Sequence, residues 1–160
     1  MAEEFSTESQ NERAVAFLRI AVGVLFLIFA EYKVFGQEFR HAGFSFWINK
    51  FLEQGVYPFM APVLRGFVLP HATLFAYLVA YGELAIGLAL TLGIAVRLAS
   101  AFGLLFMLTL ILSSDYPGAG AAFWEYFGGS LSHSVFALCF LTFLIGRSTA
   151  KLSLAALRQK

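Results

Sequence analysis

The sequence predicts an all-α protein, an integral membrane four-helix bundle with an interfacial amphipathic segment between helices 1 and 2. Hydrophobic residues make up 59% of the chain and charged residues only 13%, whereas soluble domains carry roughly 25% charged residues. Four apolar runs recur along the 160 residues, with lengths that suit helices in a bilayer. The weak alternating pattern of an outer-membrane β-barrel is absent. We therefore expect one small helical bundle and no second domain.

The expected organisation is four membrane spans between two polar tails. The spans cover about residues 14–34, 72–96, 98–114 and 129–146, and together they form one transmembrane domain over 14–146, with a polar acidic tail at 1–13 and a basic tail at 147–160. The first apolar run is longer than a signal-peptide core, and no A-x-A cleavage pattern follows it. We interpret this run as a retained helix.

One face of the first span carries a cation toward each end. Arg19, Gly23, Phe26, Ala30 and Lys33 recur at helical spacing and so fall on one line. The two cations can extend to the membrane surfaces along their aliphatic stems or act inside the bundle, and the sequence leaves both interpretations open. Gly23 and Ala30 predict a line along which another helix approaches closely.

The long connection after the first span predicts a short amphipathic helix. Apolar residues recur at helical spacing from Phe44 to Leu52, opposed by polar residues, and Gly55 ends the pattern. Three prolines then interrupt an apolar stretch too short to span a membrane. This stretch is interpreted as either a cap over the bundle or an interfacial anchor.

Glu83 is the only carboxylate in the second span. A carboxylate near the middle of a bilayer costs at least a few kcal/mol and is therefore expected to be protonated, paired or turned into the bundle. Two interpretations remain open. Glu83 is either a structural tie to Arg19 or to a tyrosine such as Tyr81, or a proton-accepting wall of a pocket for a lipophilic molecule.

The packing faces of the middle helices can be predicted from their small residues. In the second span Tyr77, Tyr81, Ala85, Ala89 and Gly93 form a ridge beside Glu83. We expect its lower half, with the small residues, to be a packing face. In the third span the corresponding ridge is Ala99, Gly103 and Met107. Only Arg97 separates these two spans, so we expect them to be antiparallel neighbours.

Four titratable residues are expected toward one end of the bundle. His71, Asp115, His133 and Lys33 would meet there if the spans alternate in direction, and such a cluster suits proton transfer or the binding of a polar headgroup. The alternative is that each is a separate cap or interfacial side chain. No HxxxH pair occurs and His71, Asp115 and His133 come from separate segments, so no metal is expected. Without a GxGxxG or Walker pattern no nucleotide is expected either.

Charge and cysteine content exclude further classes. The net charge of +1 and the scattered cations give no reason to expect a nucleic-acid partner. The single cysteine, Cys139, excludes a disulfide or thiol relay within the chain. More Lys and Arg residues lie on the side of the two termini than on the other side. We therefore expect a multi-pass protein of the cell inner membrane with both termini cytoplasmic.

Two stretches resemble the DoxX and DoxD-like membrane proteins. They are LRIAVGVLFLIFAEYKVFG in the first span and VLPHATLFAYLVAYGELAIGLALTLGIAVRLASAFG across the second and third. The second stretch contains a Gly-Glu pair, then GLxLxLG, then an Arg that opens the third helix. The residues that match the family pattern are Arg19, Gly23, Lys33, Gly82, Glu83, Gly87, Gly93 and Arg97. The resemblance implies a four-helix membrane bundle.

The DoxD-like branch of this family is the membrane subunit of a thiosulfate:quinone oxidoreductase that acts with a DoxA subunit. The resemblance thus implies quinone as cofactor, the bilayer and a DoxA-like or other redox subunit as partners, and leaves homo-oligomerisation open. Glu83 and His133 are the expected catalytic residues, and the expected ligand-binding residues are Arg19, Lys33, Tyr81, Arg97, His71 and Asp115. The alternative function is a non-catalytic membrane scaffold or assembly factor for a partner complex.

Overall fold

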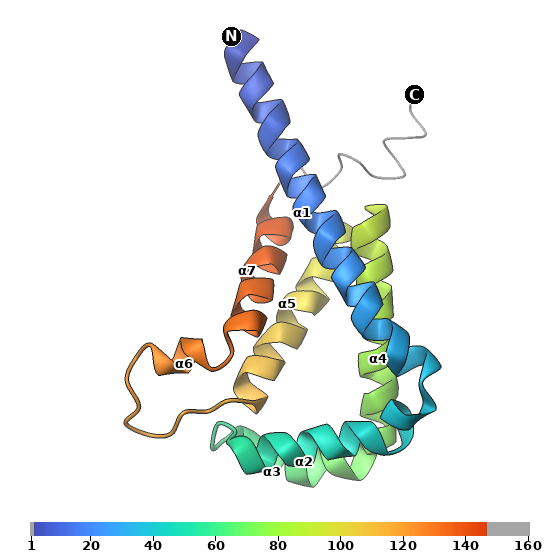
Figure 1. Ribbon diagram of the computed structural model, residues 1–160, viewed down its shortest axis with the longest axis vertical. Helices are drawn as coiled ribbons and strands as arrows, with labels where there is room; N and C mark the ends of the chain where they lie inside the picture. The colour runs from blue at the N-terminus through green and yellow to red at the C-terminus, as the bar shows by residue number, and fades with distance from the viewer. Residues whose placement is uncertain (1, 147–160) are drawn as a thin grey trace.

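A computed structural model describes residues 2–146 of the chain. Within this range the secondary structure consists of helices, and four of them are long: α1 (Ala2–Phe35), α4 (Ala72–Leu92), α5 (Val96–Ser113) and α7 (Leu131–Ile145). The packing is most extensive between α1 and α4 and between α5 and α7, while contacts of α4 with α5 and of α1 with α7 close the ring. Figure 1 shows the start of α1 and the end of α7 at the same end of this bundle. The predicted all-α bundle is confirmed.

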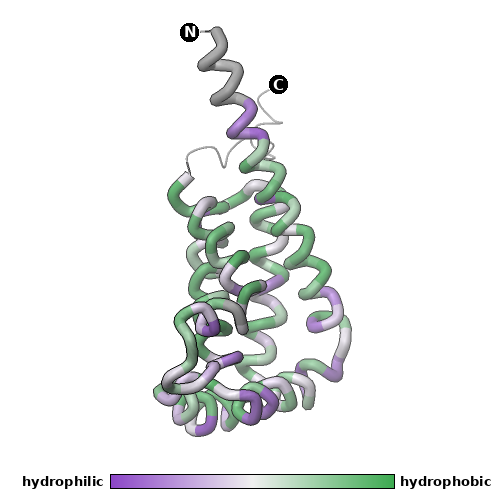
Figure 2. The backbone as a smooth tube through the Cα atoms, turned by 60° about the vertical axis from the view of Figure 1, so that its left-hand side comes forward, coloured by the Kyte–Doolittle hydropathy of each residue, from purple (hydrophilic) through white to green (hydrophobic). Residues whose placement is uncertain are grey.

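The long helices have the length and composition of membrane spans. Among the described residues, three helical stretches are long and apolar enough to cross a bilayer: Gln10–Phe35, Met60–Leu92 and Val96–Ser113. The fourth bundle helix, α7, is apolar but shorter. Figure 2 shows hydrophobic residues along the body of the bundle and hydrophilic residues concentrated toward its two ends. The chain is therefore a multi-pass membrane protein.

Short helices between α1 and α4 form a layer across one end of the bundle (Figure 1). They are η1 (Phe39–Gly43), α2 (Phe44–Gln54), α3 (Met60–Val63), η2 (Leu64–Val68) and η3 (Leu69–His71). Phe44 and Ile48 of α2 are buried in a second apolar core, which confirms the predicted amphipathic helix. The helix ends at Gly55, where φ is 119° and an added Cβ would lie 2.9 Å from the Tyr116 carbonyl oxygen. This glycine lets the layer bond to the end of α5, because the Tyr116 N–H donates to the Gly55 carbonyl.

Two helix boundaries differ from those expected. The first helix begins at Ala2, so the acidic segment predicted as a tail at 1–13 continues α1. The second span ends at Leu92 instead of residue 96, because Gly93 and Ala95 adopt left-handed conformations with φ of 71° and 48° and turn the chain into α5. The basic tail predicted at 147–160 lies outside the described residues. The short α6 (Glu125–Gly128) precedes α7.

Close backbone contact joins α1 to α4. An added Cβ on Gly23 would lie 2.6 Å from Thr91 Oγ1, and one on Gly87 would lie 2.8 Å from Leu27 Cδ2. Such separations are too short for any side chain, so the two helices depend on glycine here. The predicted inward line of α1 is confirmed, since Phe26 and Ala30 are buried beside Gly23.

The packing face predicted for the small-residue half of the α4 ridge is correct only in part, since Ala89 packs against the main apolar core whereas Ala85 is exposed. Tyr77 and Tyr81 are 40% and 46% exposed, and their rings stack on each other with centroids 6.0 Å apart. The face that packs is made instead of Ala76, Ala80, Glu83, Gly87 and Leu90. Small residues at these positions let α1 approach, whereas the tyrosines are too bulky for so close a contact. Glu83 therefore lies on the packing face itself and not beside it.

An aromatic contact closes α5 against α7. Phe140 of α7 is fully buried over Gly103 of α5, in the space that a side chain at position 103 would need. Phe26 of α1 meets Phe140 edge-on, with ring centroids 5.2 Å apart. Ala99 and Met107 are buried on the same side of α5 as Gly103, which confirms the ridge predicted for this helix.

Candidate functional site

Glu83 of α4 and Lys33 of α1 form a buried ion pair. The Lys33 ammonium lies 2.6 Å from both carboxylate oxygens of Glu83 and donates to each. The side chains are only 7% and 13% exposed, so little solvent competes for these bonds. The antiparallel register explains the pairing: Gly23 faces Thr91 and Leu27 faces Gly87, and continuing along α1 brings Lys33 to the level of Glu83.

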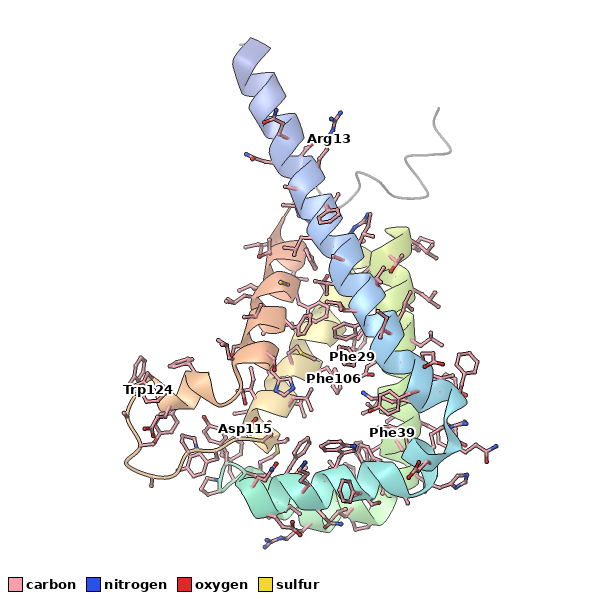
Figure 3. All side chains as sticks on the ribbon, in the orientation of Figure 1. Arg13, Phe29, Phe39, Phe106, Asp115 and Trp124 are labelled. Atoms are coloured by element: carbon pink, nitrogen blue, oxygen red, sulfur yellow. The ribbon has the colours of Figure 1, made fainter. Side chains whose placement is uncertain are left out.

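Two aromatic rings complete the surroundings of the Lys33 ammonium. Lys33 Nζ lies 5.7 Å from the centroid of the Tyr32 ring and 5.4 Å from that of Phe39. Both distances fall within the range of cation–π attraction. Phe39 is supplied by η1, near the end of α1 (Figure 3). The ammonium is therefore held by one carboxylate and by π-faces, which suits a cation removed from water.

On its other side, Glu83 lines a partly open pocket between α4 and α5. The pocket has a volume of about 650 Å³, within the range of sites for small organic ligands. Its walls are almost entirely apolar, and several of the lining residues are also exposed at the bundle surface, among them Leu78, Leu98, Phe102 and Leu105. Since that surface faces lipid in a membrane protein, a lipophilic molecule can enter from the bilayer.

Two further lining residues shape this pocket. Gly82 leaves open space, because an added Cβ there would have no atom within 4 Å outside its own helical turn. The polar side chains in the pocket lining are those of Glu83 on α4 and Thr109 on α5. The Thr109 hydroxyl donates to the Leu105 carbonyl oxygen at 2.9 Å. The pocket thus combines an apolar volume with two polar groups, one on each helix.

A second pocket, of about 740 Å³, lies near the end of α1 and the layer of short helices. Tyr32 and Phe39, the two rings beside the Lys33 ammonium, belong to its lining, together with the carboxylates Glu31 and Glu38. The Lys33–Glu83 pair is therefore flanked by two pockets, an apolar one through Glu83 and a more polar one through the rings.

The partner of Glu83 differs from the two candidates that the sequence suggested. Arg19 is fully buried, but the register of α1 against α4 places it beyond Thr91, toward the turn between α4 and α5. Tyr81 is half-exposed and contacts Tyr77, and it is not among the residues that line either pocket. Arg97 is exposed at the start of α5 and is likewise outside both linings.

Of the four residues expected to cluster at one end of the bundle, Asp115 and His133 lie near each other, whereas Lys33 and His71 have separate contacts. Lys33 is bound to Glu83, whereas His71 is exposed and its Nδ1 lies 2.9 Å from the Phe67 carbonyl oxygen. Asp115 accepts a hydrogen bond from Ser130 Oγ at 3.2 Å and interacts electrostatically with His133. Among the described residues, no three His, Cys, Asp or Glu side chains are placed to hold a metal ion.

The sequence did not reveal three residues of the site, Tyr32, Phe39 and Thr109, and a fourth, Gly82, was named only as a match to the family pattern. Tyr32 precedes Lys33 in the chain, and Gly82 precedes Glu83, so both were close to residues already selected. Thr109 is a lone hydroxyl in an apolar helix, which is a weak but usable signal. Phe39 carries no such signal, because its position depends on how η1 folds back over α1.

Comparison with known proteins identifies the family. Searches of curated proteins and of solved structures gave no match to this chain. A family model described as DoxX matches residues 14–114, which is more than half of the chain. The matched range contains the Lys33–Glu83 pair and every residue that lines the pocket between α4 and α5. This match, on a bundle of apolar helices, shows that the chain belongs to the DoxX family of membrane proteins.

Proposed function

We propose that this chain is the quinone-binding membrane subunit of an oxidoreductase, which passes electrons from a small donor such as thiosulfate to the membrane quinone pool. The observation that carries the proposal is an ion pair, Lys33–Glu83, in the wall of an apolar pocket between two membrane helices. A quinone has an apolar ring and tail with two polar oxygens, and the pocket offers that combination of surfaces. The apolar walls hold the ring and the tail, and the polar side chains can bind the ring oxygens once these carry protons.

The proposed reaction balances with thiosulfate as donor. Two thiosulfate ions joined as tetrathionate release two electrons, and a quinone that takes up two electrons and two protons becomes a quinol. The Glu83 carboxylate, held by Lys33, is suited to accept a proton and pass it on to the reduced ring, after which it returns to the ionised, Lys33-bound form. The donor is oxidised on a second, DoxA-like subunit or another redox partner, since the pocket residues of this chain are not themselves redox centres.

The topology supports a placement in the cell inner membrane. The start of α1 and the end of α7 lie at one end of the bundle (Figure 1), which supports the expectation that both termini are on one side of the membrane. The distribution of Lys and Arg in the sequence favours the cytoplasm for this side. The layer of short helices then faces the periplasm or the exterior, where a soluble donor is available.

The first experiment measures quinone binding by the purified protein in lipid nanodiscs. We expect decylubiquinone to bind, and Gly82→Leu to abolish binding because leucine fills the open space in the pocket. Gly66→Leu is the matched control, since a Cβ on Gly66 also meets no atom within 4 Å but Gly66 is not part of the pocket lining. Absence of binding to ubiquinone and menaquinone analogues alike, or equal binding by the two variants, would contradict the proposal.

The second experiment tests the reaction and the alternative function. Thiosulfate-dependent quinone reduction is measured in membranes that contain the chain and its genomic neighbours' products, with Glu83→Gln for comparison. We expect reduction by the wild type and a lower rate for the variant. Purification with a stoichiometric protein partner, no bound quinone and no activity in any combination would favour the non-catalytic scaffold instead.

A further inference from the structure

We infer that the pocket between α4 and α5 binds the reduced quinol more tightly than the oxidised quinone, because the polar side chains in its lining offer only hydrogen-bond acceptors. This inference rests on the proposed function and adds a preference for one redox form. The pocket residues that carry it are Glu83 and Thr109.

Thr109 has already used its only hydrogen-bond donor. Its hydroxyl donates to the carbonyl oxygen of Leu105, one turn earlier on α5, at 2.9 Å. A threonine hydroxyl carries one donor and two acceptor lone pairs. Once the proton is bound to the helix backbone, Oγ1 can only accept from a ligand.

Glu83 is also restricted to accepting. Both of its oxygens accept from the Lys33 ammonium at 2.6 Å, which is the arrangement of an ionised carboxylate with its counter-ion. A carboxylate offers about four acceptor positions, and Lys33 occupies only part of them. The remaining positions are available to a donor in the pocket, which Glu83 lines.

The backbone supplies no compensating donor at this level. Glu83 lies inside α4 (Ala72–Leu92) and Thr109 inside α5 (Val96–Ser113). In the interior of an α-helix each N–H group donates to the carbonyl four residues earlier. A ligand placed between Glu83 and Thr109 therefore meets acceptors from both helices.

This pattern distinguishes the two redox forms of a quinone. The oxygens of a quinone are carbonyls, which accept hydrogen bonds, and those of a quinol are hydroxyls, which donate. A quinol thus gains bonds that a quinone cannot form, and the quinone carbonyls would face other acceptors. Tighter binding of the reduced form makes the bound quinone a stronger oxidant, by about 30 mV for each tenfold difference in affinity. The pocket would thereby favour electron transfer from the donor.

The test compares decylubiquinol with decylubiquinone, which share the same tail, on the intact protein in nanodiscs under anaerobic conditions. We expect the quinol to bind about tenfold more tightly, the effect of a net gain of one or two hydrogen bonds. The dimethyl ether of decylubiquinol has no donor and should bind no more tightly than the quinone. Equal affinity for quinol and quinone, a preference for the quinone, or quinol-like binding of the ether would overturn the inference.

Thr109→Val isolates one acceptor, because valine keeps the shape of threonine without its hydroxyl. We expect this variant to reduce the preference for quinol about threefold. The matched control is Thr142→Val on α7, where the hydroxyl makes the same bond to Leu138 at 2.9 Å but is not part of the pocket lining. The inference fails if the two variants behave alike. If neither redox form binds to the wild type, the proposed function fails with it, whereas equal binding of both forms overturns the inference alone.

Discussion

Gly82 and Gly87 lie on the same helix, α4, but they differ in their surroundings. At Gly87 an added Cβ would come within 2.8 Å of the Leu27 side chain of α1, whereas at Gly82 it would meet open space in the pocket beside α5. The first glycine closes a contact between helices, and the second leaves a volume unfilled. Glu83 takes part in both environments, because it binds Lys33 of α1 and also lines the pocket.

The different surroundings of Gly82 and Gly87 show how the bundle can hold a pocket and still pack its core closely. Its helices associate as two closely packed pairs, α1 with α4 and α5 with α7, each closed at a glycine. The contact between α4 and α5 is less extensive, and the pocket lies along it. Tight packing within the pairs therefore carries stability, while the looser contact between them is available to a ligand.

Among the variants that test this difference between the two helix contacts, Lys33→Met should lower the free energy of unfolding the most. The substitution leaves the Glu83 carboxylate buried without its cation, and breaking a buried pair in this way costs about 3–5 kcal/mol of unfolding free energy. Denaturant titration in detergent measures the loss. In the double variant Lys33→Met/Glu83→Leu most of the stability should return, because an apolar pair can replace a buried ion pair.

The control for this prediction is Lys50→Met. Lys50 lies on α2 with its ammonium 4.7 Å from the centroid of the Trp47 ring, outside the α1–α4 contact. A cation–π contact of this kind contributes at most about 1–2 kcal/mol, so its loss should be clearly smaller. An equal loss for the two lysines would show that the Glu83 pair has no special role in closing α1 against α4.

A smaller effect is expected when the two glycines are compared directly. Gly87→Val forces side-chain atoms into Leu27, and overpacking of this kind costs about 1–3 kcal/mol. Gly82→Val enters open space and should change stability by less than about 1 kcal/mol. Thermal unfolding of both variants in the same detergent makes the comparison. If Gly82→Val were the more destabilising, the open space beside it would not exist in the folded protein.

The smallest effect is expected for Tyr81→Phe. The tyrosine is nearly half-exposed and stacks on Tyr77 away from the Lys33–Glu83 pair, so removal of its hydroxyl should change quinone affinity by less than about twofold. Binding of decylubiquinone and decylubiquinol to nanodisc-embedded protein provides the measurement, with Glu83→Gln as the variant expected to weaken binding of the quinol. A tenfold loss for Tyr81→Phe would place this hydroxyl in contact with the ligand and extend the site to the other face of α4.

The sequence predicted those features that depend on periodic burial. The inward line of α1, the ridge at Gly103 and the amphipathic α2 were correct because apolar and small residues recur there at helical spacing. The packing face of α4 was predicted only in part, at Ala89, since this helix is apolar on every side and its pattern does not distinguish small from exposed aromatic faces. When lipid covers the surface of a bundle, hydrophobicity alone does not indicate which face of a helix packs against its neighbours.

The site was predicted only in part, for physical reasons that differ between residues. Glu83 was found because a carboxylate in an apolar helix is costly and rare. Its partner was missed because the pairing depends on the register of α1 against α4, which the long connection between them determines. The pocket beside Glu83 was only one of two open interpretations, because a pocket consists of space that side chains leave empty and no sequence pattern records the open volume at Gly82.

The unequal lengths of the helices have a consequence for the surrounding bilayer. The described α7 has 15 residues and α4 has 21, which correspond to about 22 Å and 31 Å of helix. A bilayer has a hydrocarbon core of about 30 Å, so α4 matches it and α7 is too short. The shortfall in helix length is therefore greatest at α7, where the bilayer must thin or a neighbouring helix must cover the difference. The protein should accordingly partition into thinner regions of a membrane and orient its α7 side toward them.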